Sequence, residues 1–119
     1  MRDQAGKLAV RSDRAEVIAE NMLVAYNSGD YQALSKDWSR PMRFVIRERA
    51  FRRFRRENLP ITGPFKAIIS VTPTPGQHDP GHMSYQVRAR FEKRDGVLFT
   101  ITLSSGSAKV EGVEFKAQF

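Results

Sequence analysis

The stretch that decides the fold is Met83–Ser104, MSYQVRARFEKRDGVLFTITLS. Apolar and polar residues alternate along both of its halves, on either side of Asp95-Gly96. The apolar positions are Met83, Tyr85, Val87, Ala89 and Phe91, followed by Val97, Phe99, Ile101 and Leu103. Alternation on both sides of Asp-Gly is typical of an antiparallel hairpin with one buried and one solvated face. Because that buried face needs a covering layer, we expect helices to pack on it.

The sequence before residue 65 has the periodicity of helices. A stripe of apolar residues from Ala15 to Tyr26 recurs at steps of three and four, which indicates one buried helical face. Ser12 or Asp13 is a suitable N-cap for this helix, and Asn27-Ser28-Gly29 a suitable end. The sequence therefore predicts a first helix that begins at residue 12 or 13.

Two further helices are expected downstream. Asp30 can cap a short second helix. Ser39, with Pro41 in the first turn, can cap a third whose apolar stripe runs to Phe54. The stripe is least regular near residues 47–49, where a break is left open. Ile61–Pro64 is predicted to be a linker.

The C-terminal half reads as strands. Phe65–Thr72 and Ala108–Phe119 are predicted to flank the hairpin, and Gly112 indicates a bulge in the last strand. The fold class is therefore α+β, with three N-terminal helices packed on a curved four-stranded antiparallel sheet. We expect residues 1–11 to be a flexible N-terminus and residues 12–119 to form a single domain.

Charge is concentrated in one segment of this 119-residue chain. The net charge is +7, and Arg40–Glu57 carries eight arginines against two glutamates, which is +6. The absence of cysteine excludes disulfides, thiolate metal sites and a cysteine nucleophile. No apolar run reaches the length of a membrane helix, and the N-terminus lacks the apolar core of a signal peptide. The sequence leaves open whether the protein is cytoplasmic or has lost a leader.

Several short segments resemble one superfamily. They are Asn27–Tyr31, Trp38–Met42, Gly63–Phe65, Tyr85–Phe91 and Val110–Val113. With these turn and core positions the chain resembles the cystatin-like, or nuclear-transport-factor-two-like, superfamily, and in particular a small bacterial and archaeal domain family of unknown function whose members are often exported. The resemblance implies a conical fold with a pocket between helices and sheet. It does not imply one use, because the superfamily holds isomerases, dehydratases and noncatalytic binding or dimerisation modules.

The pocket implied by this resemblance supplies the first candidate site. Tyr26, Trp38, Tyr85 and Phe99 are the expected lining residues, and Asp37 is the candidate acid–base carboxylate. The alternative is that the aromatic residues simply fill the core, with Asp37 paired to Arg40.

Two other candidates come from charged and imidazole side chains. Arg52, Arg53, Arg55 and Arg56 form a candidate anion-binding cluster, with a solvated helix face as the alternative. His78 and His82 flank Asp79 and are candidate metal ligands, although no third ligand is close in sequence. We expect no cofactor and no metal.

The leading hypothesis is a noncatalytic domain that binds a small apolar or anionic ligand or a partner. We expect it to form a homodimer through the solvated face of the sheet, which is made by Ser84, Gln86, Arg88, Arg90, Thr100 and Thr102. Two alternatives stay open: a small isomerase or hydrolase that uses Asp37, and an anionic-polymer binder that uses the Arg40–Arg56 segment. Nucleic acid is not a favoured partner, because no DNA- or RNA-reading motif is present.

Overall fold

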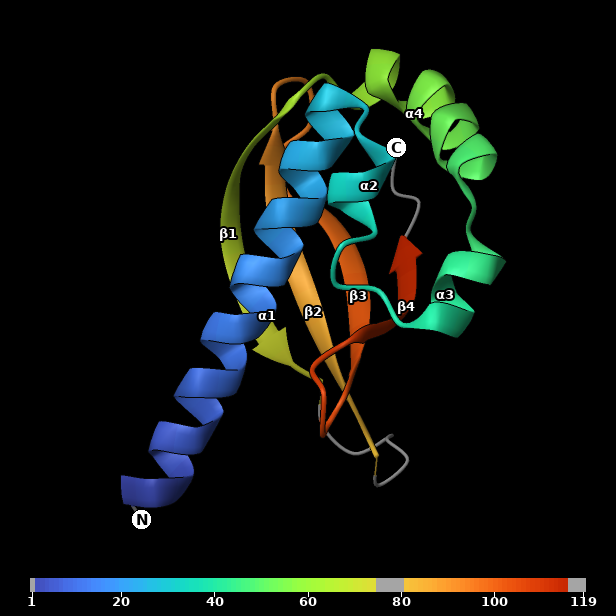
Figure 1. The fold of residues 1–119 in the computed structure, drawn as a ribbon. Helices are drawn as coiled ribbons and strands as arrows, with labels where there is room; N and C mark the ends of the chain where they lie inside the picture. The colour runs from blue at the N-terminus through green and yellow to red at the C-terminus, as the bar shows by residue number, and fades with distance from the viewer. Residues whose placement is uncertain (1, 75–80, 116–119) are drawn as a thin grey trace.

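The computed structural model describes residues 2–74 and 81–115, with side chains from Asp13 onward. In this part of the chain four helices precede four strands (Figure 1). The elements are α1 (Arg2–Ser28), α2 (Tyr31–Leu34), α3 (Arg40–Val45), α4 (Glu48–Thr62), β1 (Phe65–Pro73), β2 (His82–Phe91), β3 (Val97–Ser104) and β4 (Val110–Phe115). The α+β class is confirmed, with four helices instead of three.

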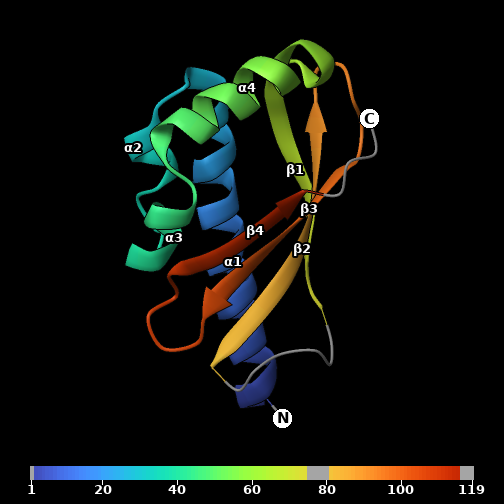
Figure 2. The ribbon, with the colours of Figure 1, turned by 90° about the vertical axis from the view of Figure 1, so that its right-hand side faces the viewer.

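The four strands form one antiparallel sheet in the order β1-β2-β3-β4. The predicted hairpin is confirmed: Val87 pairs with Phe99, and both side chains are buried. Gly96, in the turn, has a φ of 75°, a conformation that favours glycine. The pairing of β3 with β4 has a register shift, in which Glu111 is an extra residue beside Gly112, where a bulge was predicted. Such shifts bend a sheet. The resulting curved sheet is open at both edges (Figure 2).

Helix α1 covers the inner face of this sheet (Figure 1). The predicted apolar stripe is buried there, and Ile18 and Ala19 are fully buried. The helix starts at Arg2, however, so the predicted start at Ser12 or Asp13 is wrong. The residues before Ser12 include alanine, leucine, lysine and arginine, all good helix formers, and extending a helix costs far less than nucleating one. A capping residue therefore marks a start only where the preceding sequence cannot extend the helix.

The caps of the short helices are confirmed. The Asp30 carboxylate accepts a 3.1 Å hydrogen bond from the Ala33 amide, and the Ser39 hydroxyl accepts one of 3.3 Å from the Met42 amide. The third predicted helix is divided into α3 and α4 by a break at Ile46 and Arg47, as the irregular stripe allowed.

Helix α4 includes the first two residues of the predicted linker Ile61–Pro64 and ends at Thr62, so the linker begins later than predicted. Pro60 lies in its last turn, where the missing N–H removes only one backbone hydrogen bond. Gly63 then ends the helix with a φ of 68°. This longer α4 crosses the helix-covered side of the sheet (Figures 1 and 2), and its Phe54 ring contacts Phe115 of β4, with centroids 5.0 Å apart.

Candidate functional site

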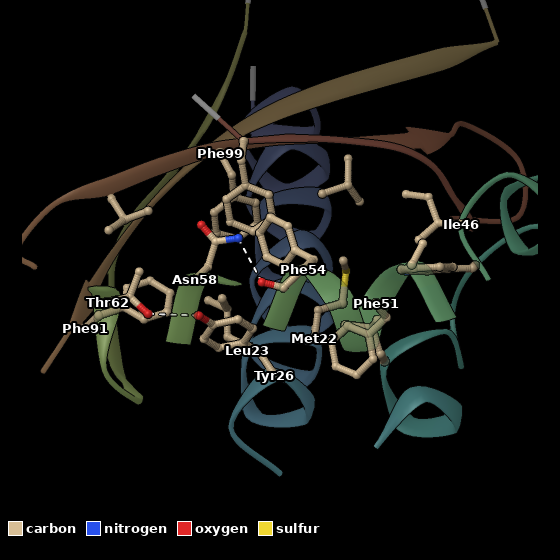
Figure 3. Close-up of a pocket in the computed structure, with 16 residues that line it drawn as sticks. Met22, Leu23, Tyr26, Ile46, Phe51, Phe54, Asn58, Thr62, Phe91 and Phe99 are labelled. Atoms are coloured by element: carbon tan, nitrogen blue, oxygen red, sulfur yellow. Dashed lines mark hydrogen bonds between the residues drawn. The ribbon is translucent and has the colours of Figure 1, made fainter. Parts of the chain in front are cut away.

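A pocket of about 360 Å³ lies between the C-terminal half of α1, helix α4 and strands β2 to β4 (Figure 3). Its wall is almost entirely apolar or aromatic. The lining residues are Met22, Leu23, Tyr26, Leu34, Trp38, Ile46, Ala50, Phe51, Phe54, Asn58, Thr62, Phe91, Val97, Phe99, Val113 and Phe115. In the described part of the chain, three of the four helices and three of the four strands contribute to the wall. Helix α3 does not contribute, and it ends directly before the lining residue Ile46.

Aromatic rings hold one another in place around the pocket. Phe99 and Phe115 stack with centroids 5.1 Å apart, and Phe115 lies 5.0 Å from Phe54 of α4. Tyr26 meets Phe54 and Phe91 edge-on, at 6.2 and 5.8 Å. Because each ring touches at least one other across an element boundary, the wall is largely preformed.

The polar groups at one end of the pocket satisfy one another. The Thr62 hydroxyl donates a 2.8 Å hydrogen bond to the Gly63 carbonyl, so the Tyr26 hydroxyl donates to Thr62 Oγ1 at 2.9 Å. Burial raises the pKa of the Tyr26 phenol, although Thr62 and the nearby Arg55 act in the opposite direction. Tyr26 is therefore a neutral hydrogen-bond donor. The Asn58 amide nitrogen donates to the Phe54 carbonyl at 2.8 Å (Figure 3).

Trp38 differs from these groups. Its side chain is buried and packs edge-on against Tyr31, with ring centroids 6.0 Å apart. Its indole Nε1–H is a buried donor for which the described residues supply no acceptor. Unpaired buried donors are rare in native proteins and cost free energy, so this one requires an explanation.

Three of the four predicted pocket residues line the pocket: Tyr26, Trp38 and Phe99. Tyr85 is not among the lining residues of this pocket. Tyr85 and Phe91 share one face of β2, but six residues of strand separate them by roughly 20 Å. Tyr85 is buried in the core at the other end of the sheet, beside a small cavity of about 50 Å³.

Asp37 also lies away from the pocket. Its carboxylate is 3.7 Å from the Arg14 guanidinium of α1, and not in an ion pair with Arg40. It is absent from the pocket wall although its neighbour Trp38 is part of it. Adjacent residues of the short segment before α3 point in different directions, so sequence proximity did not bring Asp37 into the site.

The contribution of α4 to the pocket wall was not predicted from the sequence. Phe54, Asn58 and Thr62 follow one another at steps of four and form one stripe along the pocket side of the helix. The spacing was present in the sequence, but the linker predicted at Ile61–Pro64 excluded Thr62, its last member. Phe91 and Phe115 were assigned to the strands but not to the pocket.

The four arginines of the predicted anion site have separate roles. Arg52 and Arg53 form ion pairs with Glu48 and Glu57 one turn away on α4. Arg55 donates hydrogen bonds of 2.7 Å to the Tyr26 and Asn27 carbonyls at the end of α1. Of the four, only Arg56 has no such partner among the described residues. The side chains therefore do not converge on one anion.

The candidate metal ligands are not brought together either. His82 pairs with Glu111 across the end of the sheet. His78 lies outside the described residues. Within the described ranges, no group of three histidine, aspartate or glutamate side chains could hold a metal ion.

No protein-family model matches this chain, and no curated protein matches it in sequence. Among the helices of the described residues, none combines the length and apolar content needed to span a membrane.

Proposed function

We propose that this protein is a noncatalytic domain that binds a small apolar molecule between α4 and the sheet. The observation that carries the proposal is the apolar pocket of about 360 Å³, which the protein's own side chains leave unfilled. No carboxylate, histidine or lysine is among its lining residues, so the wall offers recognition of shape and little acid–base chemistry.

The size of the pocket supports an occupant. The pocket is open to solvent on one side, where the exposed Ala50 forms part of its wall, so water covers its apolar surface when no ligand is bound. Covering that surface with an apolar molecule is favourable by about 25 cal/mol per Å² of apolar area removed from water. A ligand fills the space while leaving α4 in place. An engineered apolar cavity of about 150 Å³ binds benzene, so this one suits a molecule of two or three rings or an alkyl chain of similar volume.

Trp38 adds one polar requirement. The indole N–H of Trp38 has no acceptor among the described residues and is itself covered from solvent, so a ligand carbonyl or ether oxygen would satisfy it only where binding moves the wall around the indole. The proposed ligand is therefore an apolar body with one hydrogen-bond acceptor.

A neutral fluorescent probe, N-phenyl-1-naphthylamine, tests the binding. We expect saturable binding with a dissociation constant of order micromolar. This expectation assumes a binding free energy of about 0.4 kcal/mol for each non-hydrogen atom of the probe. Trp38 is the only tryptophan in the sequence, so its emission should change with the same dependence on probe concentration. Ala50→Phe, which blocks the pocket wall, should weaken binding at least about tenfold, whereas Ala33→Phe on exposed α2 should not. Non-saturable binding, or equal binding by both variants, would refute the pocket.

Fluorene and 9-fluorenone test the acceptor, because they differ mainly by a carbonyl in place of a methylene group. Fluorenone should displace the probe about fivefold better from the native protein, which corresponds to about 1 kcal/mol for one hydrogen bond. The two competitors should be equal in Trp38→Phe. A preference for fluorenone that survives in Trp38→Phe would assign the acceptor to another group.

We also infer that the curved sheet and its helices form the cone of the cystatin-like superfamily. Its support is the resemblance in sequence, the bulged antiparallel sheet and the position of the pocket between helices and sheet. Self-association through the solvated sheet face belongs to the same proposal, and its test is given in the Discussion.

A further inference from the structure

The junction of α3 and α4 exposes two large apolar side chains. Phe44 and Val45, at the end of α3, are 66% and 76% exposed, more than any other large apolar residue of the described chain. They are adjacent in sequence, at a projecting corner between two helices (Figure 1). Contiguous exposed apolar surface rimmed by polar residues often marks an interaction site. We call residues 40–49 the α3–α4 corner.

Cationic side chains surround this apolar pair. Arg40, Arg43, Arg47 and Arg49 are all exposed, although the Arg43 guanidinium donates hydrogen bonds to the Ser35 and Lys36 carbonyls, at 3.2 and 3.4 Å. The Arg47 guanidinium lies over the Phe44 ring, 5.7 Å from its centroid, while Arg40 and Arg49 make no ion pair with any described residue. The one acidic residue of the corner, Glu48, is already paired with Arg52. The corner therefore combines an apolar tip with four cations.

The corner also adjoins the pocket. Ile46 follows Val45 directly and lies at the same end of the pocket as Phe51 (Figure 3). Ala50, one residue after the corner, is exposed and still belongs to the pocket wall. A surface that holds the corner would therefore face this end of the pocket.

We propose that the α3–α4 corner docks on the surface of an anionic phospholipid bilayer. Phe44 and Val45 enter the boundary between headgroups and acyl chains, and Arg40, Arg47 and Arg49 contact lipid phosphates. Charge complementarity favours an anionic surface, and the apolar pair distinguishes a bilayer from a nucleic acid. A phosphate backbone offers no apolar phase for Val45, which has no ring to stack on a base.

Vesicle flotation tests the proposal. The native protein should bind vesicles of equal parts phosphatidylcholine and phosphatidylglycerol, and bind pure phosphatidylcholine at least about tenfold more weakly. Binding should also weaken as salt screens the arginines.

The variant Phe44→Ser/Val45→Ser should lose at least about tenfold in vesicle affinity, because it removes the inserted groups. Both residues are exposed, so the fold should persist, as circular dichroism would verify. The matched control is Val17→Ser/Val24→Ser, which removes two apolar residues of α1 that are 49% and 52% exposed. Arg40→Gln/Arg49→Gln should lose binding to anionic vesicles to a similar extent as the apolar variant.

Three outcomes would overturn the proposal. The first is equal vesicle binding by the native protein and Phe44→Ser/Val45→Ser. The second is equal binding to neutral and anionic vesicles. The third is binding to a single-stranded oligonucleotide that is tighter than vesicle binding and unaffected by loss of Phe44 and Val45, which would make the corner a nucleic-acid surface. Ala50→Phe should still bind vesicles, so failure of the pocket and failure of the docking surface are separable.

Discussion

Arg55 of α4 donates a 2.7 Å hydrogen bond from Nε to the backbone carbonyl of Tyr26 in α1. The same guanidinium donates to the Asn27 carbonyl, also at 2.7 Å. These bonds satisfy carbonyls at the end of α1 that have no intrahelical partner, and a cation there complements the helix dipole. They also hold α4 at a fixed distance above the pocket. An arginine expected to bind an anion thus joins two walls of the proposed site.

The first prediction follows from this link. Arg55→Met keeps most of the side-chain stem but removes both charge-assisted hydrogen bonds, and should lower the free energy of unfolding by about 2 kcal/mol. Arg56→Met, at an exposed neighbour, should change it by less than about 0.5 kcal/mol. Urea denaturation measures both. Equal effects of the two substitutions would show that the bonds to α1 carry no net stability.

The second prediction concerns alkaline pH. Burial raises the pKa of Tyr26 above its ordinary value of 10.0, so the folded state keeps the phenol proton where the unfolded chain releases it. The stability that results is complete below pH 10.0 and is lost as the pH rises through the folded pKa. Urea denaturation between about pH 9 and 11 should therefore show a steeper fall for the native protein than for Tyr26→Phe. Parallel curves for Tyr26→Phe and the native protein would contradict the assignment.

The third prediction concerns the end of α4. Gly63 has a φ of 68° and a ψ of −178°, a region of backbone conformation that is essentially limited to glycine. An added Cβ would also lie 2.9 Å from the Glu92 Cβ. Gly63→Ala should therefore cost about 1–3 kcal/mol of unfolding free energy, by thermal or urea denaturation. Gly106→Ala, where an added Cβ meets nothing within 4 Å, should be close to neutral. A neutral Gly63→Ala would mean that α4 ends differently.

The fourth prediction separates Asp37 from the pocket. Because its carboxylate faces Arg14, Asp37→Asn should change probe affinity by less than about twofold. Losing this partly exposed ion pair should cost less than about 1 kcal/mol of stability. Fluorescence titration with N-phenyl-1-naphthylamine measures the first effect. A loss as large as that of Ala50→Phe would return Asp37 to the site and revive the enzymatic alternative.

The fifth prediction tests self-association. Thr100 lies on the solvated sheet face, paired with Gln86 and Glu114. If this face forms a symmetric dimer, sedimentation should show a dimer that Thr100→Lys weakens at least about tenfold, since two copies would bury like charges together. Ser105→Lys, in the turn after β3, is the control. A native protein that stays monomeric at the highest soluble concentration would rule out the dimer.

Local chemistry explains what could be predicted. The hairpin, its turn, the two side-chain caps and the bulge near Gly112 each depend on neighbours in sequence or on strict alternation, and all of these agree with the structure. The errors have local causes as well. The first helix extends past its expected cap, and α4 continues through Pro60, because a cap or a proline in a terminal turn is a weak barrier to a helix.

The candidate site could not be predicted in the same way. Alternation showed which face of β2 is buried, but distance along the strand decided that Phe91 and not Tyr85 meets the pocket. The sequence by itself determined the α+β class, the sheet and the buried stripe of α1, because these follow from periodicity. Only the tertiary structure decided that Arg55 binds α1 and that Trp38 is left without an acceptor among the described residues. Those results depend on which segments far apart in sequence meet in space, and no local pattern of residues encodes these contacts.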